Sequence, residues 1–382
     1  METVYDLAVS FADRGLGELR ADGSMPPGCN GPWDDAETPV RNTGHWLITF
    51  LEAHEITDET RYLDAARDAA AYLLSEEARP HGETFHHRHG GDRDRCNGLI
   101  GQAWSIEALA VAAERLDDTR LCSVAERTFL RHPFDRRLAA WRPVEIDGTS
   151  LPLDMTFNHQ LWFAAAGAIL ANLPEVDPRV GRRVERFLDE LAANVDTTPE
   201  GRIEHIFKPE FDLSKYLRIF YDGLRAGTAH KMVAGQLRSI LGRDGDGTGG
   251  TFEKQAVGYH SFNLYGLAIL YDEYPDHRFW ETRTFRSTLE YAESDTYERR
   301  LADNPYGYPY NCAGIELAVA FERFGVGDDE TRRAWIGRQL EATYDDETGT
   351  FSRNTPDPRT LTARIYEATR LSDIRLPESI HH

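Results

Sequence analysis

Apolar and polar residues follow one another along this chain in a pattern that repeats about every 50 to 60 residues. In residues 43–74 an apolar run is followed by a short acidic turn and then by an amphipathic segment with Arg and Asp on one face. The pattern recurs in residues 97–130, 158–191, 259–292 and 311–344, with a less regular copy in residues 213–241. Each copy predicts a helical hairpin whose first helix is buried on all sides and whose second helix is buried on one face.

Six such hairpins predict an all-α fold, an (α/α)6 toroid in which the first helix of each pair lies inside and the second lies outside. An open solenoid is the alternative. The chain ends favour closure, because residues 4–14 and 360–371 each predict a lone helix and these two helices can pair with each other. We therefore expect residues 1–382 to form a single toroid domain around a central cavity.

The charge of the chain excludes several classes of partner. It carries 64 Asp and Glu against 43 Lys and Arg, for a net charge of −21. Nucleic acid and anionic lipid bind clustered cations, so this surface predicts neither as a partner. An excess of acidic residues, with Arg preferred to Lys among the basic ones, is typical of a protein kept soluble in concentrated salt. No apolar run is long enough for a membrane span and the start predicts no signal peptide, so we expect a cytoplasmic protein.

The sequence predicts no metal and no cofactor. Four cysteines, Cys29, Cys96, Cys122 and Cys312, stand far apart without a CxxC pair, which indicates neither a zinc site nor a disulfide framework. The histidines at 86, 87 and 89 lack a second ligand cluster at metal-site spacing. A phosphate-binding loop of the GxxxxGK[ST] kind is absent.

In a toroid the inner helices direct their N-terminal ends at one mouth of the cavity, and polar and aromatic residues gather at these starts. Aromatic faces stack on sugar rings, while amides and guanidinium groups bind hydroxyls and carboxylates, so the pattern predicts a carbohydrate ligand. The candidate substrate-binding residues are Trp33, Arg41, Trp46, Arg95, Asn97, Gln102, Trp104, Asn158, Trp162, Lys208, Asn263 and Asn311.

Each of these residues also has a structural interpretation. The tryptophans of the inner helices can fill the ring, and the asparagines at helix starts can act as N-caps. Titratable groups at the same mouth are the candidates for catalysis, because imidazole, phenol and carboxyl groups can exchange protons with a substrate. The candidate catalytic residues are Asp154, His159, Tyr259, His260 and Tyr310.

The segments NGLIGQAWSIEALAVAAERL and VGYHSFNLYGLAILYDEYPDHRFW resemble the helix pairs of toroid enzymes that act on uronic acids, among them the glucuronyl C5-epimerases and unsaturated uronyl hydrolases. The epimerase signature Tyr-Asp-Leu-Arg-His-Phe is replaced here by Lys215-Tyr216-Leu217-Arg218-Ile219-Phe220. With its acidic composition, the whole chain resembles the AglQ-type proteins of haloarchaeal N-glycosylation clusters. This resemblance implies a role in supplying or modifying a hexuronic acid of a glycan.

Epimerisation at C5 of a uronate requires two acid/base groups on opposite faces of the sugar and cations on its carboxylate. His159 or Tyr310 on one side, and Tyr259 or His260 on the other, supply candidates for the first role. Arg41, Arg95 and Lys208 are candidates for the second. A uronyl hydrolase or lyase is one alternative, and in the hydrolase Asp154 and one of Asp34, Asp92 or Glu107 would act as the acid pair or as the sole acid. A non-catalytic sugar-binding protein is the other alternative.

Overall fold

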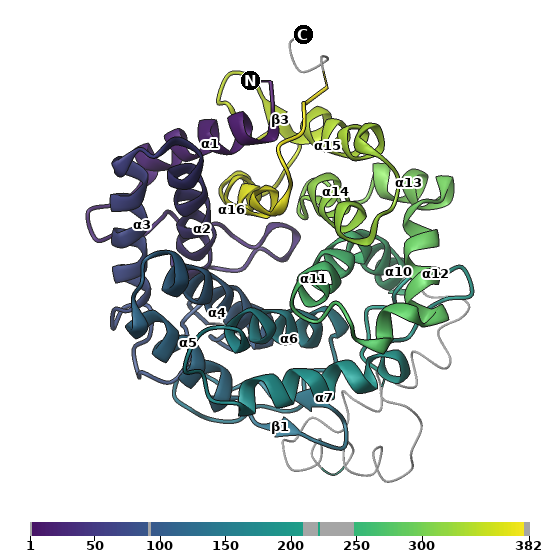
Figure 1. The fold of residues 1–382 in the computed structure, drawn as a ribbon, viewed down its shortest axis with the longest axis horizontal. Coiled ribbons are helices and arrows are strands. Elements are labelled where there is room, and N and C mark those ends of the chain that lie inside the picture. The colour runs from purple at the N-terminus through teal and green to yellow at the C-terminus, as the bar shows by residue number, and fades with distance from the viewer. Residues whose placement is uncertain (1, 91–92, 209–220, 222–247, 378–382) are drawn as a thin grey trace.

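The computed structural model describes residues 2–90, 93–208, 221 and 248–377, and in it the helices form a closed ring (Figure 1). One set of helices stands inside the ring, and further helices surround it on the outside. The inner elements are α2 (Val40–Thr57), α4 (Gly98–Arg115), α6 (Phe157–Ala171), α11 (His260–Glu273), α14 (Ala313–Phe324), and α16 (Pro358–Ala363) continued by the 3-10 helix η3 (Arg364–Arg370).

The outer layer follows the same order around the ring. It consists of α1 (Val4–Glu18), α3 (Thr60–Leu73), α5 (Thr119–Arg131), α7 (Arg179–Asn194), η2 (Arg278–Glu281) with α12 (Arg283–Ala292) and α13 (Asp295–Ala302), and α15 (Asp329–Thr343). A further helix, α10 (Thr248–Gly258), leads into α11.

The ring closes through the two ends of the chain. Each inner element contacts the next in the order α2, α4, α6, α11, α14 and η3, and η3 returns to α2. The N-terminal and C-terminal segments are hydrogen-bonded in antiparallel fashion, with Val4 N donating to Ile374 O at 3.0 Å and Leu376 N donating to Glu2 O at 2.8 Å. The sixth pair is therefore α1 with α16 and η3. The sequence pattern had assigned it to residues 213–241, of which only Tyr221 belongs to the described residues.

Burial differs between inner and outer helices as the hydrophobic pattern predicts. In α4, 15 of 18 residues are buried, whereas in α5 only five of 13 are buried, all on one face. A helix surrounded by other helices must be apolar nearly all round, while an outer helix needs a single apolar stripe. The predicted all-α toroid is confirmed.

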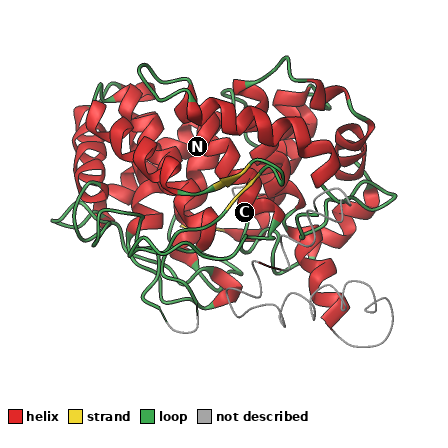
Figure 2. Cartoon of the chain, turned by 90° about the horizontal axis from the view of Figure 1, so that it is seen from below, coloured by secondary structure: helices red, strands yellow, loops and turns green. Residues whose placement is uncertain are grey.

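Short strands and long loops complete the fold. Two antiparallel hairpins, β1 (Phe134–Asp135) with β2 (Ala140–Trp141) and β3 (Tyr344–Asp345) with β4 (Thr350–Phe351), follow α5 and α15. Figure 2 shows the ring from its side, with longer loops gathered along one face. Within the described part of the chain, no helix is long and apolar enough to cross a membrane.

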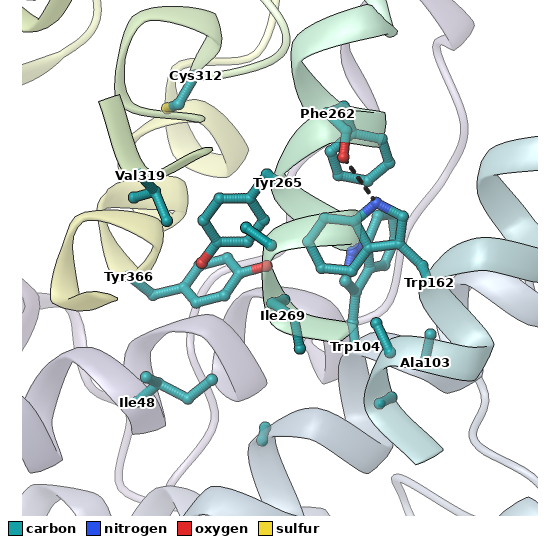
Figure 3. Packing of buried hydrophobic residues seen from close by; sticks show 14 of the residues in the cluster. Ile48, Ala103, Trp104, Trp162, Phe262, Tyr265, Ile269, Cys312, Val319 and Tyr366 are labelled. Atoms are coloured by element: carbon teal, nitrogen blue, oxygen red, sulfur yellow. Dashed lines mark hydrogen bonds between the residues drawn. The ribbon is translucent and has the colours of Figure 1, made fainter. Parts of the chain in front are cut away.

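Aromatic side chains fill the interior of the ring. Trp162 of α6 stacks on Phe262 of α11 with ring centroids 4.4 Å apart, and its indole Nε1 donates to the Phe262 carbonyl at 3.2 Å (Figure 3). Tyr265 and Tyr366, both buried, lie beside this stack. This packing joins neighbouring inner helices into one continuous core, which positions the starts of these helices.

Candidate active site

A cavity of about 290 Å³ lies at the mouth of the ring where the inner helices begin. Asn97, Thr156 and Tyr259 precede α4, α6 and α11 respectively, and all three line this cavity. Helix N-termini present free N–H groups and a partial positive charge, which favour anionic or hydroxyl-rich ligands. The residues lining the cavity are Asn30, Trp33, Arg88, Arg93, Asp94, Asn97, Ile100, Trp104, Thr156, Asn158, His159, His205, Tyr259, Phe262, Tyr310, Asn311 and Arg364.

His159 and Asp154 form a hydrogen-bonded pair at the start of α6. His159 Nδ1 lies 2.7 Å from Asp154 Oδ2. Burial acts to raise the pKa of the Asp154 carboxyl, but His159 and the hydrogen bonds from Thr156 outweigh burial and hold this pKa below its ordinary value. An ionised carboxylate only accepts hydrogen bonds, so Nδ1 carries the hydrogen and Nε2 is left as the basic nitrogen. The His159 side chain is 27% exposed and lines the cavity.

A second wall of the cavity carries linked hydroxyl groups. Trp33 Nε1 donates to the Tyr259 hydroxyl oxygen at 3.2 Å. Tyr310 Oη and Arg41 Nη1 both donate to Asn30 Oδ1 at 2.8 Å. Burial raises the pKa of Tyr259 well above 10, so its hydroxyl stays protonated at neutral pH and can donate to a ligand. This wall therefore offers aromatic faces and neutral hydroxyl donors.

Two arginines stand at the rim. Arg88 pairs with Asp35 and Asp94, each at 3.0 Å, and Arg93 pairs with Asp35 at 2.9 Å. The Arg93 guanidinium lies 5.5 Å from the Trp33 ring centroid, within cation–π range. Because the Arg93 side chain is 45% exposed, its guanidinium remains accessible to an anionic group of a ligand.

The structure gathers most of the predicted site residues in one place. Two predicted residues outside the lining contact residues that line the cavity. Asp154 is hydrogen-bonded to His159, and the Arg41 guanidinium lies 3.9 Å from the Trp104 ring centroid. Asn97 occupies the N-cap of α4 without a side-chain capping bond, which leaves its amide available to a ligand. The predicted residues that line the cavity are Trp33, Asn97, Trp104, Asn158, His159, Tyr259, Tyr310 and Asn311.

His260 is not where the sequence pattern placed it. Its Nδ1 accepts a hydrogen bond from Ile203 N at 3.3 Å, and its Nε2 donates to Thr288 O at 3.0 Å. The ring packs edge-on against Tyr291 and Tyr297. His260 therefore faces the outer layer, where it joins the segment around Ile203 to α12, and the predicted cavity position is wrong.

Three predicted residues of the inner helices also point elsewhere. Trp46 lies over Gly15 of α1, Gln102 bonds the backbone of Phe85, and Trp162 belongs to the aromatic stack. An inner helix is apolar nearly all round, so its sequence does not show which side faces the axis. Three further predicted residues stand outside the cavity lining: Asn263, which is buried, Lys208, whose ammonium pairs with Asp196 at 3.0 Å, and Arg95.

Sequence reasoning missed several residues of the cavity. Arg88, Arg93 and Asp94 belong to the same polar segment as the predicted Arg95, so the segment was recognised but its cavity-facing members were not. His205 lies 5.5 Å from Tyr259 between ring centroids, and burial lowers the pKa of its imidazole to about 4. Arg364 belongs to the C-terminal element, which the pattern linked only to ring closure.

The described residues contain no group of three or more His, Cys, Asp or Glu side chains that could hold a metal ion.

Solved structures of sugar-modifying enzymes share this fold. Cellobiose 2-epimerase from Bacillus thermoamylovorans matches with a TM-score of 0.63 and 11% identity, covering 96% of this chain and 98% of that one. A D-mannose isomerase matches with a TM-score of 0.61 and 12% identity, covering 95% of each chain. An unsaturated glucuronyl hydrolase specific for heparin matches with a TM-score of 0.57 and 11% identity, covering 96% and 95%. These likenesses place the chain among the (α/α)6 toroid proteins.

A relative in sequence defines the group more narrowly. Archaeal glycosylation protein Q of Haloferax volcanii is 46% identical over 376 residues, which cover 98% of this chain and 99% of the relative. The chain therefore belongs to the family of archaeal glycosylation protein Q. No family model matches the chain.

Proposed function

We propose that this protein is an enzyme of glycan assembly that epimerises or isomerises a hexuronic acid, with His159 as the general base. The observation that carries this proposal is the Asp154–His159 pair at the wall of a sugar-sized cavity. A carboxylate on Nδ1 sets the imidazole tautomer and stabilises the imidazolium ion that forms when Nε2 accepts a proton. The three guanidinium groups of the cavity, on Arg88, Arg93 and Arg364, suit a substrate that bears a carboxylate.

The reaction proceeds by proton transfer at the carbon next to the carboxyl group. His159 Nε2 takes the C5 proton, and the C5–H bonding electrons move into the carboxyl group to form an enediolate. The Tyr259 hydroxyl then gives its proton to the opposite face of C5. The Trp33 indole N–H, which bonds the Tyr259 oxygen, stabilises the transient phenolate, and protons exchanged with solvent restore both residues.

Two aspartates of the site, Asp154 and Asp94, lack the raised pKa that the hydrolase alternative requires. A glycoside hydrolase needs a carboxylic acid held protonated by a raised pKa. Burial acts to raise the pKa of both Asp154 and Asp94, but their partners lower it below the ordinary value. Burial raises the pKa of Glu107, another candidate acid, but Glu107 pairs with Arg370 at 2.9 Å and does not belong to the cavity lining. Asp92 lies outside the described residues.

Proton NMR of the protein in high-salt D2O with glucuronate-containing substrates tests the proposal. We expect the H5 signal to disappear through exchange with solvent while the glycosidic bond stays intact, because the proton taken by His159 exchanges with D2O. A new reducing-end signal without loss of H5 would establish hydrolysis instead. An unchanged spectrum across free, nucleotide-linked and lipid-linked uronates would contradict the proposal and favour a sugar-binding protein.

Gly98 provides a test of how tightly the catalytic pair is held. A Cβ at this position would lie 3.1 Å from Asp154 Oδ2 and 3.4 Å from His159 Nδ1. We expect Gly98→Ala to displace the imidazole and lower turnover about tenfold or more. Gly82→Ala is the matched control, because Gly82 has a similar positive φ but nothing within 4 Å of an added Cβ. Both variants carry the backbone strain, so an equal loss of turnover in the two would refute the positioning argument.

A further inference from the structure

One guanidinium group of the cavity lining, that of Arg364, holds two buried carboxylates, and we call these three side chains the cavity floor. Arg364 Nη2 lies 2.5 Å from Glu316 Oε1 and 2.7 Å from Glu367 Oε1. All three side chains are at most 2% exposed. Two carboxylates on the same nitrogen of a single cation repel each other, and in a buried site such a pair retains one proton between them.

The other buried carboxylates near this group have cations of their own. Glu37 pairs with Arg41 at 3.3 Å, and Glu107 pairs with Arg370 at 2.9 Å. Other titratable or charged groups face the three residues from α2, α4, α11, α13, α14 and η3. These groups are Arg41, His45, Glu107, Tyr265, Tyr297, Cys312 and Tyr366.

These surroundings favour the protonated form of the pair. Burial raises the pKa of Glu316 to about 7, although Arg364 opposes the shift. Burial also raises the pKa of Glu367, again against Arg364, and the negative charges of Glu316 and Glu107 add to the rise. The floor therefore carries no net charge when the shared proton is present and one negative charge when it is lost.

Several polar atoms of this group have no hydrogen-bond partner among the described residues. Arg364 lines the cavity, yet its Nε has no hydrogen-bond partner among the described residues. The same is true of Glu367 Oε2 and the Tyr366 hydroxyl. Buried polar atoms without partners are rare, so a group of them around a cation that lines a cavity points to a ligand or ordered water in that place.

We propose that Arg364, Glu316 and Glu367 form the subsite for the substrate's carboxylate, and that the anion binds there together with a proton. The identity of the anion as a uronate rests on the proposed function. Arg364 can attract an incoming carboxylate only while one of the two glutamates is neutral, because two ionised glutamates would repel it. The bound anion in turn favours the protonated glutamate, so anion binding and proton binding strengthen each other.

Isothermal titration calorimetry in buffers of different ionisation enthalpy measures this coupling. Above the pKa of the pair, the free protein has lost most of the shared proton, so we expect glucuronate to bind with uptake of close to one proton. Glucose, which has no carboxylate, should bind without uptake. Because the pair must be protonated for the anion to bind, the Kd for glucuronate should rise by up to about tenfold for each pH unit above the pKa of the pair.

Glu316→Gln is the decisive variant. It leaves one carboxylate with one guanidinium, so glucuronate should bind without proton uptake and with a Kd that is nearly independent of pH. Glu107→Gln is the matched control, since Glu107 is equally buried but pairs with Arg370, and it should retain the uptake. Circular dichroism checks that each variant is folded. If Glu316→Gln fails to fold, Glu367→Gln and the pH dependence of the natural protein give the same test.

Two results would overturn this proposal: glucuronate binding to the natural protein without proton uptake at any pH, or no glucuronate binding at all. The outcome is separable from that of the proposed function. Proton-coupled binding without loss of the H5 signal would keep the subsite and reject the reaction. Loss of H5 without proton uptake would keep the reaction and reject the subsite.

Discussion

Replacement of His159 by glutamine is expected to lower turnover by roughly 10²–10⁴-fold, the usual contribution of a general acid or base. Glutamine keeps a polar side chain of similar reach beside Asp154, but its amide cannot accept the substrate's proton. The His159 side chain is 27% exposed, so its removal should change the free energy of unfolding little. The measurement is the rate of H5 exchange at saturating substrate, together with urea unfolding of the same preparation.

The most informative comparison is between His159 and His205, which also lines the cavity. Burial lowers the pKa of His205 to about 4, and no carboxylate bonds its ring within the described residues. If His159→Gln retained normal exchange while His205→Gln lost it, the base would be the buried imidazole and the Asp154–His159 pair would have another role.

Replacement of His260 by alanine is expected to destabilise the fold by roughly 3–5 kcal/mol, while folded molecules remain active. The imidazole accepts from Ile203 N and donates to Thr288 O, and both backbone groups are buried. Each buried group left without a partner costs about 1–3 kcal/mol, and the missing ring adds the cost of a cavity beside Tyr291 and Tyr297. Urea unfolding measures the loss, and H5 exchange at low temperature measures the activity of the folded fraction.

An exposed histidine provides the control for this prediction. His81 lies on the surface, so His81→Ala should leave the free energy of unfolding within about 0.5 kcal/mol of the natural value. Full stability of His260→Ala combined with complete loss of exchange would contradict the structural role and return His260 to the list of catalytic residues.

The residues predicted around the starts of the inner helices divide between the cavity and the outer layer. Asn97, Asn158, His159 and Tyr259 lie within two residues of the first residue of an inner helix, and every one lines the cavity. Ring geometry brings the helix starts to one mouth, but the position of a residue around the helix axis still decides whether its side chain faces the cavity. His260, one residue after Tyr259, already turns by about 100° around the helix axis and faces the outer layer.

The direction of side chains further along the inner helices could not be predicted from the sequence either. Trp104 of α4 faces the cavity, whereas Trp46 of α2 lies over Gly15 and Trp162 of α6 stacks on Phe262. All three stand in runs that are apolar nearly all round. Hydrophobic periodicity indicates direction only where one face is polar, so it could not distinguish a cavity-facing tryptophan from one that fills the ring.

The sequence by itself determined the helical hairpins, their inner and outer layers and the polar mouth, because helix periodicity, turn residues and helix starts are local properties of the chain. Only the tertiary structure decided that the terminal helices themselves form the sixth pair of the ring and which charges meet inside it. Arg364 bonds Glu316, 48 positions earlier, and Arg370 bonds Glu107, 263 positions earlier. Such partners are brought together by the packing of distant helices, and no local pattern records the distance between them.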